Sequence, residues 1–289
     1  MKTPQITVAV ILLASSLPAF AQSSSKIDEF MQKSGLVQLV AQVKESILQG
    51  IDRTQAQAQA EMEKEKRAQP QPPKLTSEQL ERLRRAVAVA YDPGRLRDSL
   101  RSNLERLLPG GDTEVVLRWL DSPLGMRVAA IEIAASSREE MERAAPLAAK
   151  AYADLSASRR ADLDAMAKTS GAVEASASFA LAQGIAVGRG VAAAAGTYVP
   201  PASDSAKYEY FRKHADAASK SWVENAAVVY APLSDAELHQ YASVVAGASQ
   251  RRVVEATGAA LDKTLSSATT ELLRAVGVSA PTAPSKTPA

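Results

Sequence analysis

The sequence predicts an all-α protein, a multi-helix bundle, on three observations. Apolar residues recur at three- and four-residue steps, the spacing of one buried helix face, in stripes such as Leu36, Val40, Val43, Ile47 and Ile51. Helix-capping patterns precede several of these stripes. No segment shows the strict alternation of polar and apolar residues that a half-buried strand requires.

The composition fits a packed helical protein without covalent or metal cross-links. Hydrophobic residues make up 46 % of the chain, which argues against disorder, and only 4 % are aromatic. Alanine is abundant, so the core is expected to rest on closely approaching helices. The absence of cysteine from the sequence excludes disulfides, thiolate metal sites and acylation at a cleavage site.

Residues 1–21 have the pattern of a secretory signal peptide. Lys2 gives a positive start, an apolar run follows, and Ala19 and Ala21 are the small residues that signal peptidase accepts. The apolar run is much shorter than the about 20 residues that span a bilayer. We expect cleavage between Ala21 and Gln22, a periplasmic or secreted mature protein, and no transmembrane anchor.

An N-terminal helical unit is expected over residues 22–155. Its first helix begins near Lys26, pauses at Ser34-Gly35 and resumes along the stripe described above. A polar, proline-rich linker follows over about 54–75. Its first part has no apolar stripe and allows either a solvated helical extension or a loose spacer.

Local signals mark four more helices of this unit. Thr76–Gln79 has the spacing of a capping box, and the helix that it opens ends at the Asp92-Pro93-Gly94 turn. The next helix covers 95–108, and a short helix carrying Val115, Val116, Trp119 and Leu120 follows it. Ser122-Pro123 has the order of a cap followed by proline at the first helical position.

Ser137–Glu140 is a further capping box, and Pro146 is expected to kink the helix that it opens. A C-terminal helical unit is then expected over 156–276. It begins at a cap near Ser156 and pauses at Ser170-Gly171, as the first helix does at Ser34-Gly35. A disordered tail is expected over 277–289.

Within the C-terminal unit, an alanine-rich helix runs from Ala172 to about Ala195 and ends at a break that contains two prolines. A long helix begins near Asp204. Ser234–Glu237 supplies another capping box, and helix continues toward Val276. The repeated order of pause, long helix, proline break and acidic-capped helix suggests two degenerate helical repeats that pack together.

The segment Trp119–Arg127 resembles the aromatic-x-x-Ser-Pro-x-Gly-x-basic motif of domain-of-unknown-function family twenty fifty-nine. The matching residues are Trp119, Ser122, Pro123, Gly125 and Arg127. The resemblance implies a secreted helical protein, mainly of Gram-negative bacteria, with no established activity. A second, weaker match begins at Leu233 and lacks the Ser-Pro pair.

The motif also has a structural interpretation. Trp119 lies on an apolar stripe, Ser122 caps the following helix, and Pro123 fixes its entry angle. Gly125 is expected to leave room for a neighbouring helix to approach. This interpretation makes the motif a packing device and not a ligand site.

Motifs for catalysis, metals and cofactors are missing from the sequence. His214 and His239, the two histidines, lack a second ligand at the one-turn spacing of a zinc pair. The glycine-dotted run 184–190 follows no strand, so a nucleotide-binding interpretation lacks its context. The formal charge of +2 gives no reason to expect nucleic acid as a partner. We therefore predict no catalytic, metal-binding or cofactor-binding residues.

The sequence favours a non-enzymatic interaction or binding protein of the envelope. Its partner would be another envelope protein or an apolar ligand. The alternative is a hydrolase whose carboxylates or serines converge only in three dimensions. Seven of the 13 aromatic residues lie between Tyr198 and Tyr241, and Tyr198 and Tyr210 lie off the apolar stripe there. We predict that these two tyrosines form a partner surface.

Overall fold

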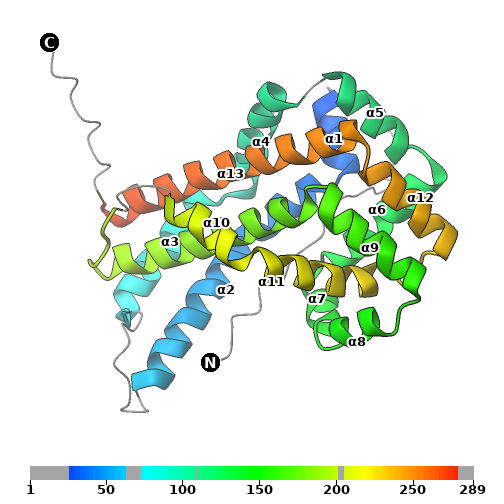
Figure 1. The fold of residues 1–289 in the computed structure, drawn as a ribbon. Helices are drawn as coiled ribbons and strands as arrows, with labels where there is room; N and C mark the ends of the chain where they lie inside the picture. Colours follow the sequence, from blue (N-terminus) through cyan, green and yellow to red (C-terminus); the bar gives the residue numbers. More distant parts are fainter. Residues whose placement is uncertain (1–25, 63–72, 109, 201–204, 279–289) are drawn as a thin grey trace, which may run out of the picture.

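The computed structural model describes residues 26–62, 73–108, 110–200 and 205–278. Within these ranges the chain forms thirteen helices and no strand (Figure 1), so the prediction of an all-α multi-helix bundle is confirmed. The predicted signal peptide, much of the linker and almost all of the predicted tail lie outside the described residues.

The bounds of the helices are α1 Lys26–Lys33, α2 Leu36–Met62, α3 Ser77–Ala90, α4 Pro93–Leu107, α5 Gly110–Leu120, α6 Pro123–Ala135, α7 Arg138–Ala144, α8 Ala148–Ala153, α9 Ala157–Thr169, α10 Ala172–Ala194, α11 Ser205–Val229, α12 Asp235–Val245 and α13 Ala248–Val276. Helix α2 extends to Met62, so the first part of the predicted linker is a helical extension. The predicted kink at Pro146 is wrong, because the helix breaks there: α7 ends at Ala144 and α8 begins at Ala148. Proline removes a backbone donor and clashes with the preceding turn.

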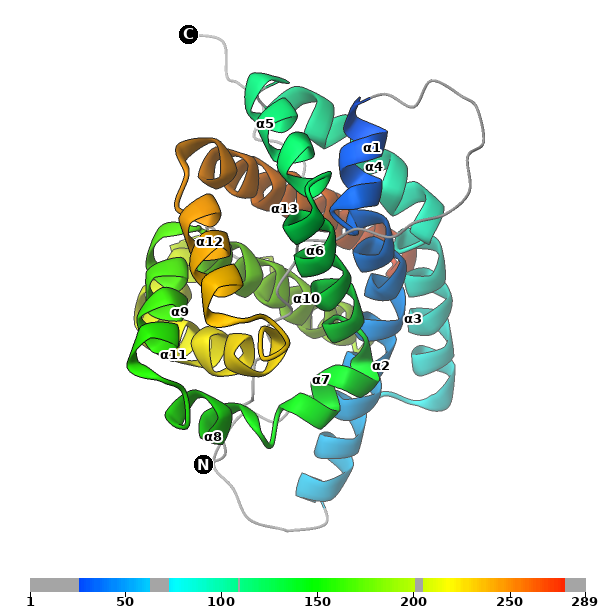
Figure 2. The same ribbon diagram turned by 90° about the vertical axis from the view of Figure 1, so that its right-hand side faces the viewer.

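The buried side chains form two cores. The first core joins α1–α5 with α10 and α13, and the second joins α9, α11 and α12 with one face of α6. Figure 2 shows the two groups of helices side by side, with α6 and α10 between them. Each core takes helices from both sides of residue 155, so the expected boundary there does not coincide with a division of the hydrophobic core.

Close packing of small residues joins two long helices of the C-terminal half, α10 and α13. A Cβ atom placed on Gly258 of α13 would lie 3.4 Å from the Cβ of Ala175 on α10. A Cβ atom placed on Gly190 of α10 would lie 3.1 Å from Cδ2 of Leu272 and 3.3 Å from Cδ1 of Leu83. The abundance of alanine therefore has a structural use here. Among the described helices, α10 is also the one whose length and apolar composition would suffice to cross a membrane, and a third of its most apolar window is buried.

The two predicted pauses are left-handed glycine junctions between consecutive helices. Gly35, with φ of 62°, joins α1 to α2, and Gly171, with φ of 73°, joins α9 to α10. A residue with a side chain loses about 1–2 kcal/mol in this conformation. The glycines thus let each pair of helices change direction within two residues.

Gly171→Ala is expected to lower the free energy of unfolding by about 1 kcal/mol or more, because alanine is strained at a positive φ. Space is not the cause, since the nearest side-chain atom would be 3.7 Å from the new Cβ. Urea unfolding followed by circular dichroism measures the change. Gly184→Ala is the matched control, because Gly184 is helical with nothing within 4 Å. Equal stability of both variants would contradict the strain argument.

Candidate functional site

A buried carboxyl group lies at the centre of the second core. Glu132 of α6 has no solvent exposure, and its Oε1 accepts hydrogen bonds from the hydroxyl groups of Tyr230, at 2.5 Å, and Tyr241, at 2.8 Å. Its other oxygen, Oε2, is buried and has no hydrogen-bond partner among the described residues. An ionised carboxylate in such a place would be very costly.

Burial raises the pKa of Glu132 to about 8, although the hydrogen bonds from the two tyrosines act in the opposite direction. Burial also raises the pKa values of Tyr230 and Tyr241 well above the usual range. All three groups are therefore protonated and uncharged at neutral pH. Both tyrosine hydroxyls are committed as donors to Glu132.

Aromatic contacts extend this cluster. The ring of Trp119, from α5, stacks on that of Tyr241 with centroids 5.4 Å apart and planes 12° apart. Tyr230 meets Tyr241 edge to face at 5.5 Å. The indole Nε1 of Trp119 is buried without a hydrogen-bond partner in the described part of the chain.

Two arginines fix the turn that connects Tyr230 to helix α12. Arg159 donates to the carbonyl oxygens of Leu233, at 2.8 Å, and Tyr230, at 2.9 Å. Arg127 donates to the carbonyl of Pro232 at 2.7 Å and pairs with the carboxylate of Glu237. These bonds satisfy carbonyls at the helix end and hold the tyrosines in place.

The other motif residues build the corner between α5 and α6. Ser122 is the N-cap of α6, with Pro123 at its first position, and its Oγ accepts from the Gly125 N–H at 3.0 Å and donates to the Trp119 carbonyl at 2.6 Å. A Cβ on Gly125 would lie 2.0 Å from that same carbonyl oxygen. The close approach at Gly125 is therefore to the preceding turn, and not to a neighbouring helix as expected.

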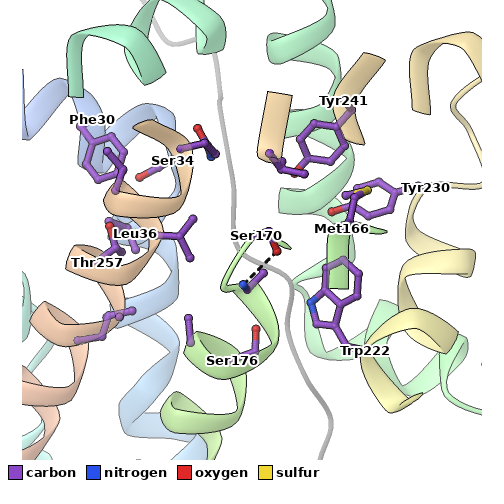
Figure 3. Close-up of a pocket in the computed structure, with 18 residues that line it drawn as sticks. Phe30, Ser34, Leu36, Met166, Ser170, Ser176, Trp222, Tyr230, Tyr241 and Thr257 are labelled. Atoms are coloured by element: carbon purple, nitrogen blue, oxygen red, sulfur yellow. Dashed lines mark hydrogen bonds between the residues drawn. The ribbon is translucent and has the colours of Figure 1, made fainter. Parts of the chain in front are cut away.

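A cavity of about 60 Å³ lies between the two cores. Figure 3 shows Phe30, Ser34, Leu36 and Thr257 on one side of it and Met166, Trp222, Tyr230 and Tyr241 on the other. Its walls thus include residues of both cores and two tyrosines of the Glu132 cluster. Cavities at such junctions are common places for small ligands.

Four buried polar atoms of the cavity lining have no hydrogen-bond partner among the described residues: Ser34 Oγ, Trp222 Nε1, Gln250 Nε2 and Thr257 Oγ1. In Figure 3 the indole nitrogen of Trp222 is on the edge of the ring that faces the cavity. Trp222 is only 1 % exposed, so bulk water does not satisfy this donor. The described lining contains no lysine, arginine, histidine, aspartate or glutamate.

Of the two residues of the predicted partner surface, the structure describes the side chain of Tyr198 only. Tyr198 is half-buried and is not a lining residue of the cavity. Tyr210 lies on α11, and its side chain is outside the described residues. The surface at Tyr198 and Tyr210 stays a prediction.

The histidines are not gathered with metal ligands in the described structure. His239, mostly exposed, lies 2.9 Å from the carboxylate of Asp162 across two helices. No group of three or more potential metal-ligating side chains occurs among the residues that could be searched.

Sequence reasoning missed the importance of Glu132. The available signal was its position in Val128–Ala135, where it is the one charged residue in an apolar helical stretch. It shares a helix face with Val128, four residues earlier, which is also buried. Comparisons of the chain with protein-family models, curated proteins and solved structures find no match.

Proposed function

We propose that the protein is an exported binding protein that holds a small ligand in the cavity between its two cores. The observation that carries the proposal is the gathering of four unpaired buried polar atoms in this one cavity. They are half of the eight such atoms in the described residues. An unsatisfied buried donor or acceptor costs about 1–3 kcal/mol, and a ligand with matching groups removes that cost.

A binding role without turnover fits the lining better than hydrolysis does. Serines reach the cavity, but activation of a serine requires a neighbouring base. The described lining offers no histidine or carboxylate for this purpose. Glu132, the acidic group of the neighbouring cluster, is fully buried and hydrogen-bonded to Tyr230 and Tyr241, and it is not a lining residue.

Export is the other part of the proposal, and residues 1–21 support it through their signal-peptide pattern. Cleavage before Gln22 would deliver the mature chain to the periplasm, or beyond it, of a Gram-negative cell. The resemblance of Trp119–Arg127 to a family of secreted helical proteins fits this location. An intact Met1 on the protein recovered from the cell envelope would contradict it.

The ligand is tested by native mass spectrometry of the mature protein purified from its own compartment under mild conditions. We expect an additional bound mass that is lost on denaturation and does not return on refolding in clean buffer. Thr257→Met should abolish the bound mass, because the longer apolar side chain fills the space beside an unpaired hydroxyl. Val89→Met is the control, since Val89 is 59 % exposed.

A ligand-free spectrum for the wild-type protein would overturn the proposal. At roughly 10–15 Å³ for each water, the cavity of about 60 Å³ has room for about four to six water molecules, which would then satisfy the polar atoms. A bound mass that Thr257→Met leaves unchanged would place the ligand elsewhere and would equally contradict a cavity site.

A further inference from the structure

We infer that the ligand of this cavity is an uncharged, mostly apolar molecule with a hydrogen-bond-accepting oxygen, such as an ester or ketone carbonyl, that the indole N–H of Trp222 binds. The inference rests on the proposed function and specifies the ligand's chemistry. Three features of the lining support it: the direction of its unpaired hydrogen bonds, its lack of charge and its apolar walls.

The unpaired groups call for an acceptor. An indole nitrogen only donates, and so does the side-chain amide nitrogen of glutamine. Trp222 Nε1 and Gln250 Nε2 are both buried without partners in the described structure. The hydroxyls of Ser34 and Thr257 can adapt to either role. The ligand must therefore bring at least one acceptor, and a donor is not required of it.

The electrostatics of the site disfavour an ion of either sign. No charged side chain is present in the described lining to compensate a buried charge. The aromatic rings of Trp222, Tyr230 and Tyr241 form part of the wall and would attract a cation by their faces. The N–H donors of Trp222 and Gln250 oppose this, however, because they present positive hydrogen atoms.

Glu132 does not supply the missing negative charge. It is fully buried, and its Oε1 is occupied by the hydroxyls of the two tyrosines. The two arginines that contact the turn between α11 and α12, Arg127 and Arg159, are paired with the carboxylates of Glu237 and Asp235. The tyrosine hydroxyls and the turn between α11 and α12 therefore bring no uncompensated charge to their side of the cavity.

The remaining walls are apolar and come from both cores. Phe30, Leu36, Val253 and Leu261 belong to the first core, and Met166 and Val245 belong to the second. Apolar contact with these side chains provides most of the binding, and the hydrogen bond to Trp222 fixes the orientation. The volume of about 60 Å³ suits a small molecule or one end of a larger one.

The test uses the indole N–H signals of the mature protein in a ¹H–¹⁵N NMR spectrum. The chain has two tryptophans, and both indole nitrogens are buried without a partner. Trp222 lines the cavity and Trp119 does not. The second signal is therefore an internal control in every titration, and Trp119→Phe assigns the pair.

Four probes of similar size distinguish the ligand classes: ethyl acetate, butyrate (the anion of its isomer butyric acid), pentane and tetramethylammonium. We expect ethyl acetate to move the Trp222 indole proton downfield in a saturable way, with an apparent Kd of about millimolar. Pentane should bind more weakly and give no downfield shift. Butyrate and tetramethylammonium should leave the Trp222 signal in place, and all four should leave Trp119 unchanged.

Trp222→Phe keeps an aromatic ring but removes the donor, and should weaken ethyl acetate binding by about fivefold to tenfold, as loss of one hydrogen bond predicts. The affinity is read from methyl signals of cavity residues. Val89→Met, at a position that is 59 % exposed, should leave the affinity unchanged. A well-dispersed spectrum of each variant shows that it has folded, and the probe series on the wild-type protein does not depend on either substitution.

Saturable binding of butyrate or tetramethylammonium in preference to ethyl acetate would overturn the inference but would leave a binding cavity in place. Equal binding of ethyl acetate and pentane would also overturn it, because the acceptor would then contribute nothing. If none of the four probes moves the Trp222 signal, the inference is also overturned. The bound mass in native spectra, and its loss in Thr257→Met, tests the proposed function separately from these outcomes.

Discussion

Replacing Gly125 with alanine is expected to lower the free energy of unfolding by about 3 kcal/mol or more. The new Cβ would lie 2.0 Å from the carbonyl oxygen of Trp119 and 2.8 Å from its carbonyl carbon. Both are backbone atoms, and the oxygen also accepts hydrogen bonds from the N–H and the hydroxyl of Ser122. The clash can therefore be relieved only if the corner between α5 and α6 opens.

The consequence extends to the buried cluster, because Trp119 stacks on Tyr241 and α6 carries Glu132. Urea unfolding measures the loss, and near-ultraviolet circular dichroism reports on the packing of Trp119. Gly188→Ala is the matched control. Gly188 lies within α10 with nothing within 4 Å, so alanine there should stabilise the helix by up to about 1 kcal/mol. If Gly125→Ala behaves like Gly188→Ala, the corner is not as tight as described.

Local signals in the sequence predicted helices and their ends well. The capping boxes at Thr76–Gln79 and Ser234–Glu237 are present as predicted, and so is the Ser122 cap followed by proline. The glycine pauses at 34–35 and 170–171 are helix junctions. Such features depend on residues within about one helical turn of each other, so the sequence pattern contains all their partners.

The tertiary arrangement had no comparable signal. Glu132 contacts Tyr230, which is 98 positions away in the sequence, and Tyr241, which is 109 positions away. The helical pattern identifies the buried face of each helix, but not the helix that covers it. This is why α10 and α13 join the first core although the sequence order placed them in a separate C-terminal unit.

The candidate site was only partly predictable for the same reason. Trp222 lies in the long helix that was expected to begin near Asp204, and it is buried. Its indole nitrogen is unpaired, and it shares the cavity lining with Ser34 and Gln250, because segments far apart in the chain pack together there. A lone glutamate inside an apolar stripe, as at Glu132, is the kind of sequence feature that marks such a junction, since a charged residue seldom enters a core without polar partners.

Glu132 is expected to make the protein less stable as the pH rises from about 4.5 to about 8. Its pKa is raised from 4.5 to about 8 in the folded protein, so in this window the folded state holds a proton that the unfolded state has released. Each pH unit then lowers the free energy of unfolding by about 1.4 kcal/mol, which amounts to about 5 kcal/mol over the whole window. The stabilising contribution is fully present below pH 4.5 and is lost as the pH rises through 8.

Other carboxyl groups act in the opposite direction, at lower pH. The guanidinium of Arg252 lowers the pKa of Asp112 to about 2, and the cap at Ser234 lowers that of Glu237. Their contributions are lost as the medium becomes acidic. A comparison with Glu132→Gln at each pH isolates Glu132, because these groups are unchanged in the variant.

Glu132→Gln keeps a carbonyl oxygen for the hydroxyls of Tyr230 and Tyr241 but cannot ionise. We expect the variant to be no more stable than the wild-type protein at pH 4.5 and clearly more stable at pH 9, with the difference changing by up to about 5 kcal/mol. Urea unfolding at a series of pH values measures it, and Glu139→Gln, at an exposed position, should show no such crossing. A wild-type protein that gains stability over the variant as the pH rises would mean that the two tyrosines hold Glu132 as a carboxylate. The uncharged environment argued for the cavity would then be wrong on the side that these tyrosines form.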